Sequence, residues 1–451
     1  MINKKTFKRE VFLTVSVMLV LSLSAQAKIT PEQAARLGTD LTPVGAETSG
    51  NAEGTIPPYT GGLQSPPTGW TPDQGYIDPF ADEQPLLTIT AANMAQYEDK
   101  LTAGMRALLM KYPQFKMPVY TTHRTAALPK EIETTVKKEA VGAELNGFGL
   151  VNLNGSTTPF PIPANGLEVI YNHNTRYLGG GFKRNFTQTP VRASGTYSLI
   201  RAQELRVYDQ NLDVHTENRL YNFIGKFLSP ASMVGNIALV YEPVDQVKEP
   251  RSAWTYSFGQ RRVRRAPIIA YDTPVEGSEG LITNDDYDAF NGAPDRYDWK
   301  LLGKREIYVG YNAYRVASKK LKYEEILKPG TPNADLMRYE LHRVWVVEAT
   351  SRPGSRHVYA RRTFYIDEDS WSVLATDAYD SRGELWRVGI HPLVQYYDAK
   401  FPWYSVSIWH DLNSGNYMVS GLANEEREPW QFGVRARAAD FEPAALRRLG
   451  N

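Results

Sequence analysis

The chain has 451 residues, and its 51 Lys and Arg residues nearly balance its 50 Asp and Glu residues. A balance this even gives no overall electrostatic attraction to nucleic acid. The chain has no cysteine, which excludes disulfides, thiol catalysis and cysteine metal sites. Its stability must therefore come from the burial of apolar surface, and the chain is long enough for a large core.

Residues 1–27 have the pattern of a secretory signal peptide. Four basic residues come first: Lys4, Lys5, Lys8 and Arg9. An apolar stretch follows over residues 11–23, and Ala25-Gln26-Ala27 then fits a cleavage site. An uncleaved anchor is the alternative, but the apolar stretch is shorter than the ~20 residues of a membrane span. We therefore expect cleavage after residue 27 and a soluble mature protein in the periplasm.

Residues 28–85 form an extended region that is rich in Gly and Pro. Thr30-Pro31-Glu32-Gln33 predicts a short helix that begins with a capping box. The rest of the region has a loop-like composition that also fits disorder. Its scattered aromatic residues favour a chain that is laid across the main body. We expect the remainder, residues 86–451, to form one helix-capped antiparallel β domain.

Two longer helices are predicted in that domain. Over residues 91–112, apolar side chains recur at steps of three and four, which is typical of a helix with one apolar face. Pro113 ends this pattern. A second helix is predicted over residues 129–145.

Strand patterns dominate from residue 182 onward. The predicted strands cover residues 186–192, 197–209, 219–227, 237–243, 253–258, 260–265, 304–318, 341–350, 357–366, 371–377, 385–390, 404–412 and 417–422. The last hundred or so residues read as one uninterrupted meander, because connections this short force neighbouring strands to be antiparallel. The loop 271–298 is an exception, since loops of that length are often lids or binding loops. We expect it to be a gate.

These elements predict a mainly β protein of the α+β class. The simplest architecture is a large curved antiparallel sheet, or open half-barrel, that encloses one or two helices. A closed barrel or a two-sheet sandwich would give much the same strand pattern.

The sequence contains no recognisable catalytic motif, and we expect no catalytic residue, metal or cofactor. There is no GxSxG elbow and no SxxK motif. His342 and His357 could approach across neighbouring strands and bind a metal, but hydrogen-bonded burial is the simpler interpretation. The acidic stretch 284–288 suggests calcium, but Phe290 occupies a ligand position and no Glu closes the loop, so a solvated acidic loop is expected.

Aromatic residues are the best candidates for a binding site. Four of them lie in consecutive predicted strands: Trp345, Tyr365, Trp371 and Trp386. Their large apolar faces suit a pocket for acyl chains, and ordinary core packing is the alternative. Arg261 and Arg265 share one face of a basic strand and could contact lipid headgroups. The alternative is a charged strand that resists aggregation.

Several motifs occur in order along nearly the whole mature chain. They are LTPVGA (41–46), GTIP (54–57), FPIP (160–163), YDWKL (297–301), YELHRVWVVEA (339–349), HVYARR (357–362), YIDED (365–369), YD (379–380) and LWR (385–387). Together they resemble the bacterial family catalogued as domain of unknown function 1329. That family is similar to the LolA and LolB type of periplasmic lipoprotein-sorting carriers.

This resemblance implies an open half-barrel capped by helices, with acyl chains bound in its concave cavity. It also implies a link to exporters of the resistance-nodulation-division type, and it supplies no catalytic residues. The chain is much larger than the LolA and LolB carriers, and its Gly/Pro-rich region has no counterpart there.

Three hypotheses for function follow. The first is a non-enzymatic periplasmic carrier of a lipid, an acyl chain or another hydrophobic cargo, with transient membrane contact and an inner-membrane exporter as a partner. The second is a non-catalytic scaffold subunit of an envelope export complex. The third is a hydrolase of envelope lipid or glycan. A secreted, near-neutral chain is not expected to bind nucleic acid.

Overall fold

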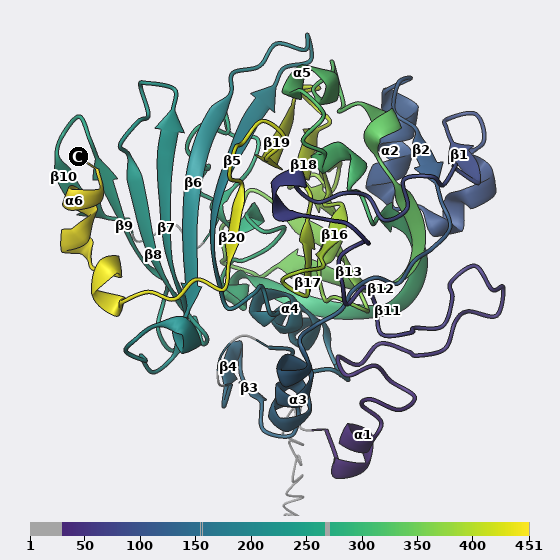
Figure 1. Cartoon of the computed structure of the whole chain (residues 1–451), viewed down its shortest axis with the longest axis horizontal. Coiled ribbons are helices and arrows are strands. Elements are labelled where there is room, and N and C mark those ends of the chain that lie inside the picture. Colours follow the sequence, from purple (N-terminus) through teal and green to yellow (C-terminus); the bar gives the residue numbers. More distant parts are fainter. Residues whose placement is uncertain (1–28, 154, 156, 267–270, 451) are drawn as a thin grey trace, which may run out of the picture.

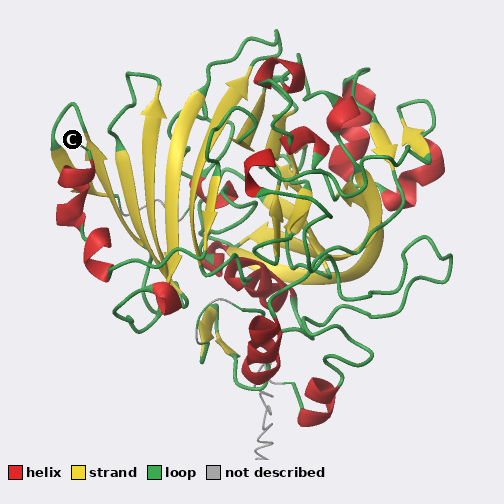
Figure 2. Ribbon diagram, viewed as in Figure 1, coloured by secondary structure: helices red, strands yellow, loops and turns green. Residues whose placement is uncertain are grey.

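A computed structural model describes residues 29–450, apart from Asn154, Ser156 and residues 267–270. The predicted signal peptide therefore lies outside the described residues. Most strands join one mostly antiparallel sheet of 16 strands, which curves around central helices and loops (Figure 1, Figure 2). The prediction of a mainly β protein is confirmed.

One half of the sheet is a meander in which each strand pairs with the next one along the chain. Its strands are β5 (Gly181–Val191), β6 (Ile200–Tyr208), β7 (Arg219–Ser229), β8 (Ile237–Pro243), β9 (Ser252–Ser257) and β10 (Arg262–Arg265). All six are predicted by the alternation of the sequence, with ends that differ by a few residues. The short β20 (Trp430–Phe432) adds to β5.

The other half of the sheet contains the carboxy-terminal strands. They are β12 (Tyr339–Ser351), β13 (Arg361–Asp367), β14 (Val373–Tyr379), β15 (Leu385–Ile390), β18 (Ser407–Asp411) and β19 (Tyr417–Leu422). β19 pairs with β5 and so joins the two halves. The expected uninterrupted meander is wrong at one place, because the chain leaves the sheet after β15 to form the separate hairpin β16 (Leu393–Tyr396) and β17 (Phe401–Tyr404).

Further strands extend the sheet beyond β12. The long β11 (Tyr297–Gly310) pairs with β12 along its whole length, whereas the sequence predicted a strand over residues 304–318. The chain turns away from β12 after Gly310, which is why the predicted strand ends too late. β1 (Leu87–Ile89) and β2 (Met117–Val119) form the end of the sheet next to β12. The hairpin of β3 (Glu144–Asn146) and β4 (Gly149–Val151) lies outside it.

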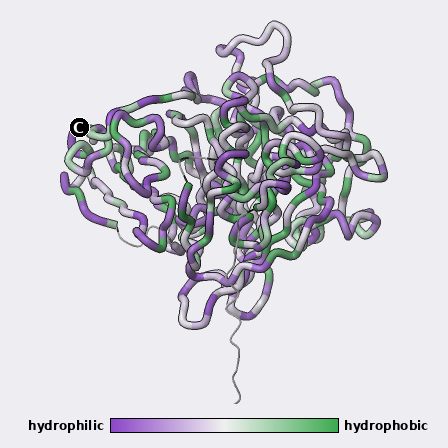
Figure 3. The backbone as a smooth tube through the Cα atoms, turned by 90° about the horizontal axis from the view of Figure 1, so that it is seen from below, coloured by the Kyte–Doolittle hydropathy of each residue, from purple (hydrophilic) through white to green (hydrophobic). Residues whose placement is uncertain are grey.

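Among the described residues, the end strands β1 and β10 do not pair with each other, so the sheet is open. This arrangement favours the open half-barrel over the closed barrel and the sandwich. Hydrophobic segments gather in the middle of the molecule, and hydrophilic segments lie mostly at the periphery (Figure 3).

The predicted helix 91–112 is wrong as a single element. It consists of the 3-10 helix η2 (Met94–Lys100) and the α-helix α2 (Ala103–Lys111). Thr102 separates them, because its extended backbone and side-chain oxygen cap α2 by accepting a hydrogen bond from the Met105 N–H (3.0 Å). The second predicted helix is the shorter α3 (Lys130–Glu139).

The helix α4 (Gly166–Thr175) has no counterpart in the sequence prediction, and it lies in the concavity of the sheet against β11 and β12 (Figure 1). Nearly all of its residues are buried, including Glu168, Asn172 and His173. It therefore lacks the one-sided apolar stripe by which surface helices are recognised. The remaining helices are short: α1 (Pro31–Ala35), α5 (Tyr323–Ile326) and α6 (Leu446–Leu449). The capping box predicted at Thr30 is confirmed.

The two ends of the described chain pack on different parts of the sheet. The carboxy-terminal tail, with Phe441 and α6, covers an apolar cluster on one face of β6 to β9 that contains Val207, Ile224 and Tyr256. We call this the outer face. The amino-terminal segment instead runs beside β11 and β12, where Arg343 donates a hydrogen bond to the Ser49 carbonyl (2.6 Å).

Candidate ligand cavity beneath the loop 271–298

A cavity of about 330 Å³ lies between the inner face of β5 to β9 and the loop 271–298. The inner face is the one opposite the carboxy-terminal tail. The loop supplies Thr273, Pro274, Val275, Glu276, Asn284, Tyr287 and Asn291 to the lining. The volume lies at the lower end of the ~300–1,000 Å³ that is usual for small-molecule sites.

The cavity wall formed by the sheet is mostly apolar. Its apolar residues are Phe186, Ala202, Phe223, Phe227, Ala238 and Val240. They lie on alternate positions of neighbouring strands, because successive side chains of a strand point to opposite faces. The positions between them, such as Val207 and Leu239, point to the outer face and form its core.

The polar part of the lining includes buried ion pairs. Glu204 accepts hydrogen bonds from Arg184 Nε (2.6 Å), Arg206 Nη2 (2.9 Å) and the Tyr287 hydroxyl (3.1 Å). Glu242 forms a second pair with Arg251 at 2.6 Å. Buried charges of this kind are tolerated when they are paired and hydrogen-bonded.

The ion pairs fix the charges of the cavity. Burial would lower the pKa of Arg206, but the adjacent Glu204 and two tyrosines raise it well above its usual range. Burial raises the pKa of Glu242, and Arg251 opposes this effect. Because these cations and carboxylates are already paired, the cavity suits a ligand held mainly by apolar contact.

Buried arginines anchor the loop 271–298. Arg362 binds both Asp285, at 2.8 Å, and Asp286. Asp288 pairs with Arg176 at 2.9 Å. The expected solvated acidic loop is therefore wrong. Asp285 and Asp286 are buried, and their oxygens accept hydrogen bonds from arginine side chains and from hydroxyl groups.

The two histidines considered as metal ligands lie in separate networks. His357 Nε2 contacts Asp285 Oδ2 at 2.9 Å, beneath the loop. His342 Nε2 contacts Glu340 Oε2 at 3.2 Å on β12. The two histidines therefore do not meet at a shared site, and each side chain is buried and contacts a carboxylate of its own.

None of the four aromatic residues expected to line a binding site lines this cavity. Trp371 is 1% exposed and adopts a left-handed backbone conformation (φ of 57°) just after the β13–β14 turn. Its Nε1–H donates to the Val44 carbonyl (2.9 Å), and its ring stacks on that of Trp345. These two residues attach the amino-terminal segment to the sheet.

Tyr365 and Trp386 also lie elsewhere. The Tyr365 hydroxyl donates to Asp377 Oδ2 (3.1 Å), on the side of the sheet that α2 covers. Trp386 is half-buried, its Nε1–H donates to Asp411 Oδ2 (2.9 Å), and Arg387 lies over its ring. The strand pattern predicts that such side chains are buried, but it does not predict which cavity or packing interface they face.

The structure separates the two arginines considered for headgroup contact. Arg261 lies in the β9–β10 turn, and Arg265 pairs with Trp254, which lies on the outer face. Arg264 is instead opposite Thr255, which lines the cavity. Arg264, with Arg262 two residues before it, therefore lies on the cavity face of β10, one register position from the expected pair.

A second hollow, of about 450 Å³, lies between the amino-terminal segment and β20. Aromatic residues such as Trp70, Tyr76 and Trp430 line it, together with the charged residues Lys319 and Asp398. Its lining therefore mixes charged and aromatic groups. The cavity beneath the loop is the better candidate for an apolar ligand.

Comparison with known proteins identifies the family of the chain. The model of the family described as "Protein of unknown function (DUF1329)" matches residues 88–447. An uncharacterised protein of Pseudomonas aeruginosa is 48% identical over 454 aligned positions, which cover 99% of each chain.

Two solved structures are also similar to this chain. A DUF1329 family protein from Desulfovibrio piger is 15% identical, with a TM-score of 0.42, over 59% of this chain and 92% of that one. A domain described as an outer membrane lipoprotein-sorting protein, from Vibrio parahaemolyticus, is 15% identical, with a TM-score of 0.44, over 63% and 98%. Among the described residues, no helix has the length and apolar character needed to cross a membrane. The match over most of the chain shows that this protein belongs to the DUF1329 family.

Proposed function

We propose that this protein is a periplasmic carrier that encloses an acyl chain, or another apolar part of a lipid, beneath the loop 271–298. The observation that carries the proposal is the cavity of about 330 Å³ with a mostly apolar wall on β5 to β8. Each methylene group that leaves water for such a wall contributes about 0.8 kcal/mol. Affinity then needs few polar contacts, and the paired charges of the cavity remain undisturbed.

The loop 271–298 is the gate in this proposal. It closes one side of the cavity, and it is attached through ion pairs such as Asp288 with Arg176 and Asp285 with Arg362. Capture and release would require this loop to move away from the sheet, without any chemical step. The acceptor of the cargo would be a membrane surface or an exporter in the inner membrane. This proposal agrees with the carrier hypothesis drawn from the sequence motifs.

The proposal can be tested with a substitution that fills the cavity. Ala238 is half-buried on β8 and lines the cavity, so Ala238→Trp should occupy its space. We expect binding of a dansyl-labelled undecanoic acid to weaken by at least about tenfold, a loss of about 1.4 kcal/mol or more. The matched control is Val234→Trp, at a position that is 43% exposed in the connection between β7 and β8.

Native mass spectrometry of wild-type protein, purified without detergent, should detect a co-purified lipid that Ala238→Trp lacks. A wild-type protein that carries no lipid and does not bind the labelled fatty acid would contradict the carrier. The scaffold hypothesis would then be favoured.

A further inference from the structure

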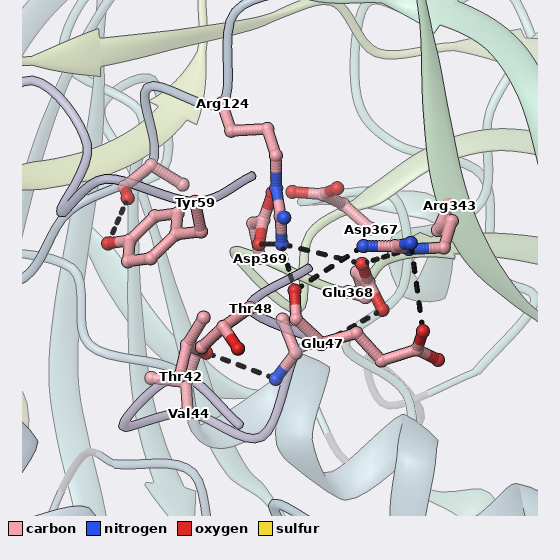
Figure 4. A network of polar contacts seen from close by, with 12 residues as sticks. Thr42, Val44, Glu47, Thr48, Tyr59, Arg124, Arg343, Asp367, Glu368 and Asp369 are labelled. Atoms are coloured by element: carbon pink, nitrogen blue, oxygen red, sulfur yellow. Dashed lines mark hydrogen bonds and ion pairs between the residues drawn. The ribbon is translucent and has the colours of Figure 1, made fainter. Parts of the chain in front are cut away.

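A second buried site lies on the other side of the molecule, where the amino-terminal segment meets the β13–β14 turn (Figure 4). His342 on β12, Asp367 at the end of β13 and Asp369 in the turn each direct one ligand atom to a common point. These three atoms lie within 4.8 Å of one another. The three residues are 1%, 0% and 7% exposed, so this is not a cluster of solvated surface acids.

Asp367 has a carboxylate oxygen without a partner. Its Oδ2 accepts hydrogen bonds from the Ser370 hydroxyl (2.6 Å) and the Tyr311 hydroxyl (3.1 Å). Its Oδ1 is buried and has no hydrogen-bond partner among the residues that the structure describes. An unsatisfied buried acceptor costs about 1–3 kcal/mol, and more when it is charged. Such an oxygen in a native fold calls for an explanation, and a bound ion would supply one.

His342 is held as metal-binding histidines usually are. Its Nε2 contacts Glu340 Oε2 at 3.2 Å, and its ring stacks on Tyr311 with 3.7 Å between the ring centres. A carboxylate on one ring nitrogen orients the ring for ligand binding, as is usual at metal sites. The sequence pattern Glu-x-His on one strand face produces this pair.

The charges around the cluster do not balance. Five carboxylates are connected through it: Glu47, Glu340, Asp367, Glu368 and Asp369. Four cations pair with them: Arg124, Lys304, Arg338 and Arg343. Arg338 is also shared with Glu83. Counted as fully ionised, the five carboxylates therefore exceed these four cations by one.

We propose that His342, Asp367 and Asp369 bind one divalent transition-metal ion, and that this ion is Zn²⁺. One imidazole nitrogen and two carboxylate oxygens are ordinary zinc ligands, whereas calcium and magnesium take oxygen ligands. Asp369 also accepts hydrogen bonds from Arg124 on both of its oxygens (2.7 and 2.8 Å), so it would bind the ion through a remaining lone pair.

The proposed ion would be structural. Arg124 and Arg343 donate hydrogen bonds to the carbonyls of Glu47 (2.7 Å) and Ser49 (2.6 Å) in the amino-terminal segment. The same two arginines bind Asp369 and Glu368 in the turn. An ion at Asp369 would therefore fix the turn to which the segment is attached. This inference does not depend on the ligand cavity, since the two sites share no residue.

The test measures zinc directly, on untagged protein that is unfolded in urea with EDTA and refolded with ZnCl2 or with MgCl2. Elemental analysis should find one zinc ion per chain after removal of free metal, and the melting temperature should rise with zinc but not with magnesium. Asp367→Asn and His342→Gln should lose the zinc and the melting shift. Circular dichroism confirms that each variant is folded.

Matched controls come from buried residues of the same types elsewhere. His357→Gln removes another buried histidine with a carboxylate partner, and Asp377→Asn removes another buried strand carboxylate with a tyrosine partner. Both should keep one zinc ion. Folded wild-type protein that binds no zinc, or a folded Asp367→Asn variant that binds as much zinc as wild type, would overturn the proposal.

Discussion

Asp377 is a buried carboxyl group whose ionisation should affect stability. It accepts hydrogen bonds from the Gly104 N–H at the start of α2 (3.0 Å) and from the Tyr365 hydroxyl (3.1 Å). Burial outweighs these bonds and raises the pKa of Asp377 from 3.8 to about 6. The folded state therefore binds this proton more tightly than the unfolded state does.

The sign of the pH dependence follows from this difference. Between about pH 4 and pH 6 the unfolded chain has lost the proton while the folded chain still holds it, so stability falls as the pH rises through this range. The loss amounts to roughly 3 kcal/mol for a difference of about two pKa units. We expect Asp377→Asn, which keeps the acceptor for Gly104, to be more stable than wild type at pH 7 but not at pH 4. Urea unfolding at both pH values tests this, and equal pH dependence of the two proteins would contradict it.

Trp371 should contribute to stability and not to ligand binding. Trp371→Phe removes the N–H that donates to the buried Val44 carbonyl (2.9 Å) and leaves a gap beside Trp345. We expect the free energy of unfolding to fall by about 2 kcal/mol. The matched control is Trp386→Phe, whose indole is half-buried and should cost less. Fatty-acid binding should stay at the wild-type level in both variants. Weaker binding by Trp371→Phe would instead place this residue in the ligand site.

The strands of the two meanders could be predicted from the sequence because each has one periodic face and is bounded by turn residues. The elements that were missed lack these signals. α4 is buried all round, and the hairpin of β16 and β17 is buried on both faces, so neither shows alternation. The break at Thr102 was missed because the apolar spacing continues through it, although Thr is a common capping residue.

The carboxy-terminal tail is a small element on which the outer face of the sheet depends. Phe441 is fully buried against the cluster of Val207, Ile224 and Tyr256. Phe441→Ala should lower the free energy of unfolding by about 3–5 kcal/mol, because it removes transfer energy and leaves a cavity. Leu449→Ala, in the same tail but 37% exposed, is the control and should change it by less than about 1 kcal/mol. Denaturant titration measures both, and equal effects would show that the tail does not cover the sheet as described.

The candidate cavity, unlike the sheet that forms it, could not be located from the sequence. Its network of ion pairs and hydrogen bonds joins Arg184, Glu204 and Tyr287, which are far apart along the chain. No local pattern indicates that the acidic stretch at 285–288 would meet arginines of three different elements. The sequence did single out the loop 271–298 by its length, and the structure places that loop over the cavity.

We expect Arg124 to hold the amino-terminal segment against the rest of the molecule. Arg124 is buried, binds both oxygens of Asp369 and donates to the Glu47 carbonyl (2.7 Å). Arg124→Met leaves Asp369 buried without its partner, which typically costs about 3–5 kcal/mol. We expect thermolysin to cleave the variant within residues 41–63 several-fold faster than wild type under native conditions.

Two controls separate local release from general destabilisation. Arg352→Met removes an arginine that is 41% exposed and pairs with the exposed Asp298, so cleavage should stay at the wild-type rate. Phe441→Ala destabilises the sheet from the other end of the chain without touching Arg124. If it is as unstable as Arg124→Met in urea yet keeps residues 41–63 protected, then Arg124 acts by holding the segment. If both variants are cleaved there at the same rate, the segment is released only by global unfolding, and Arg124 has no special part in its attachment.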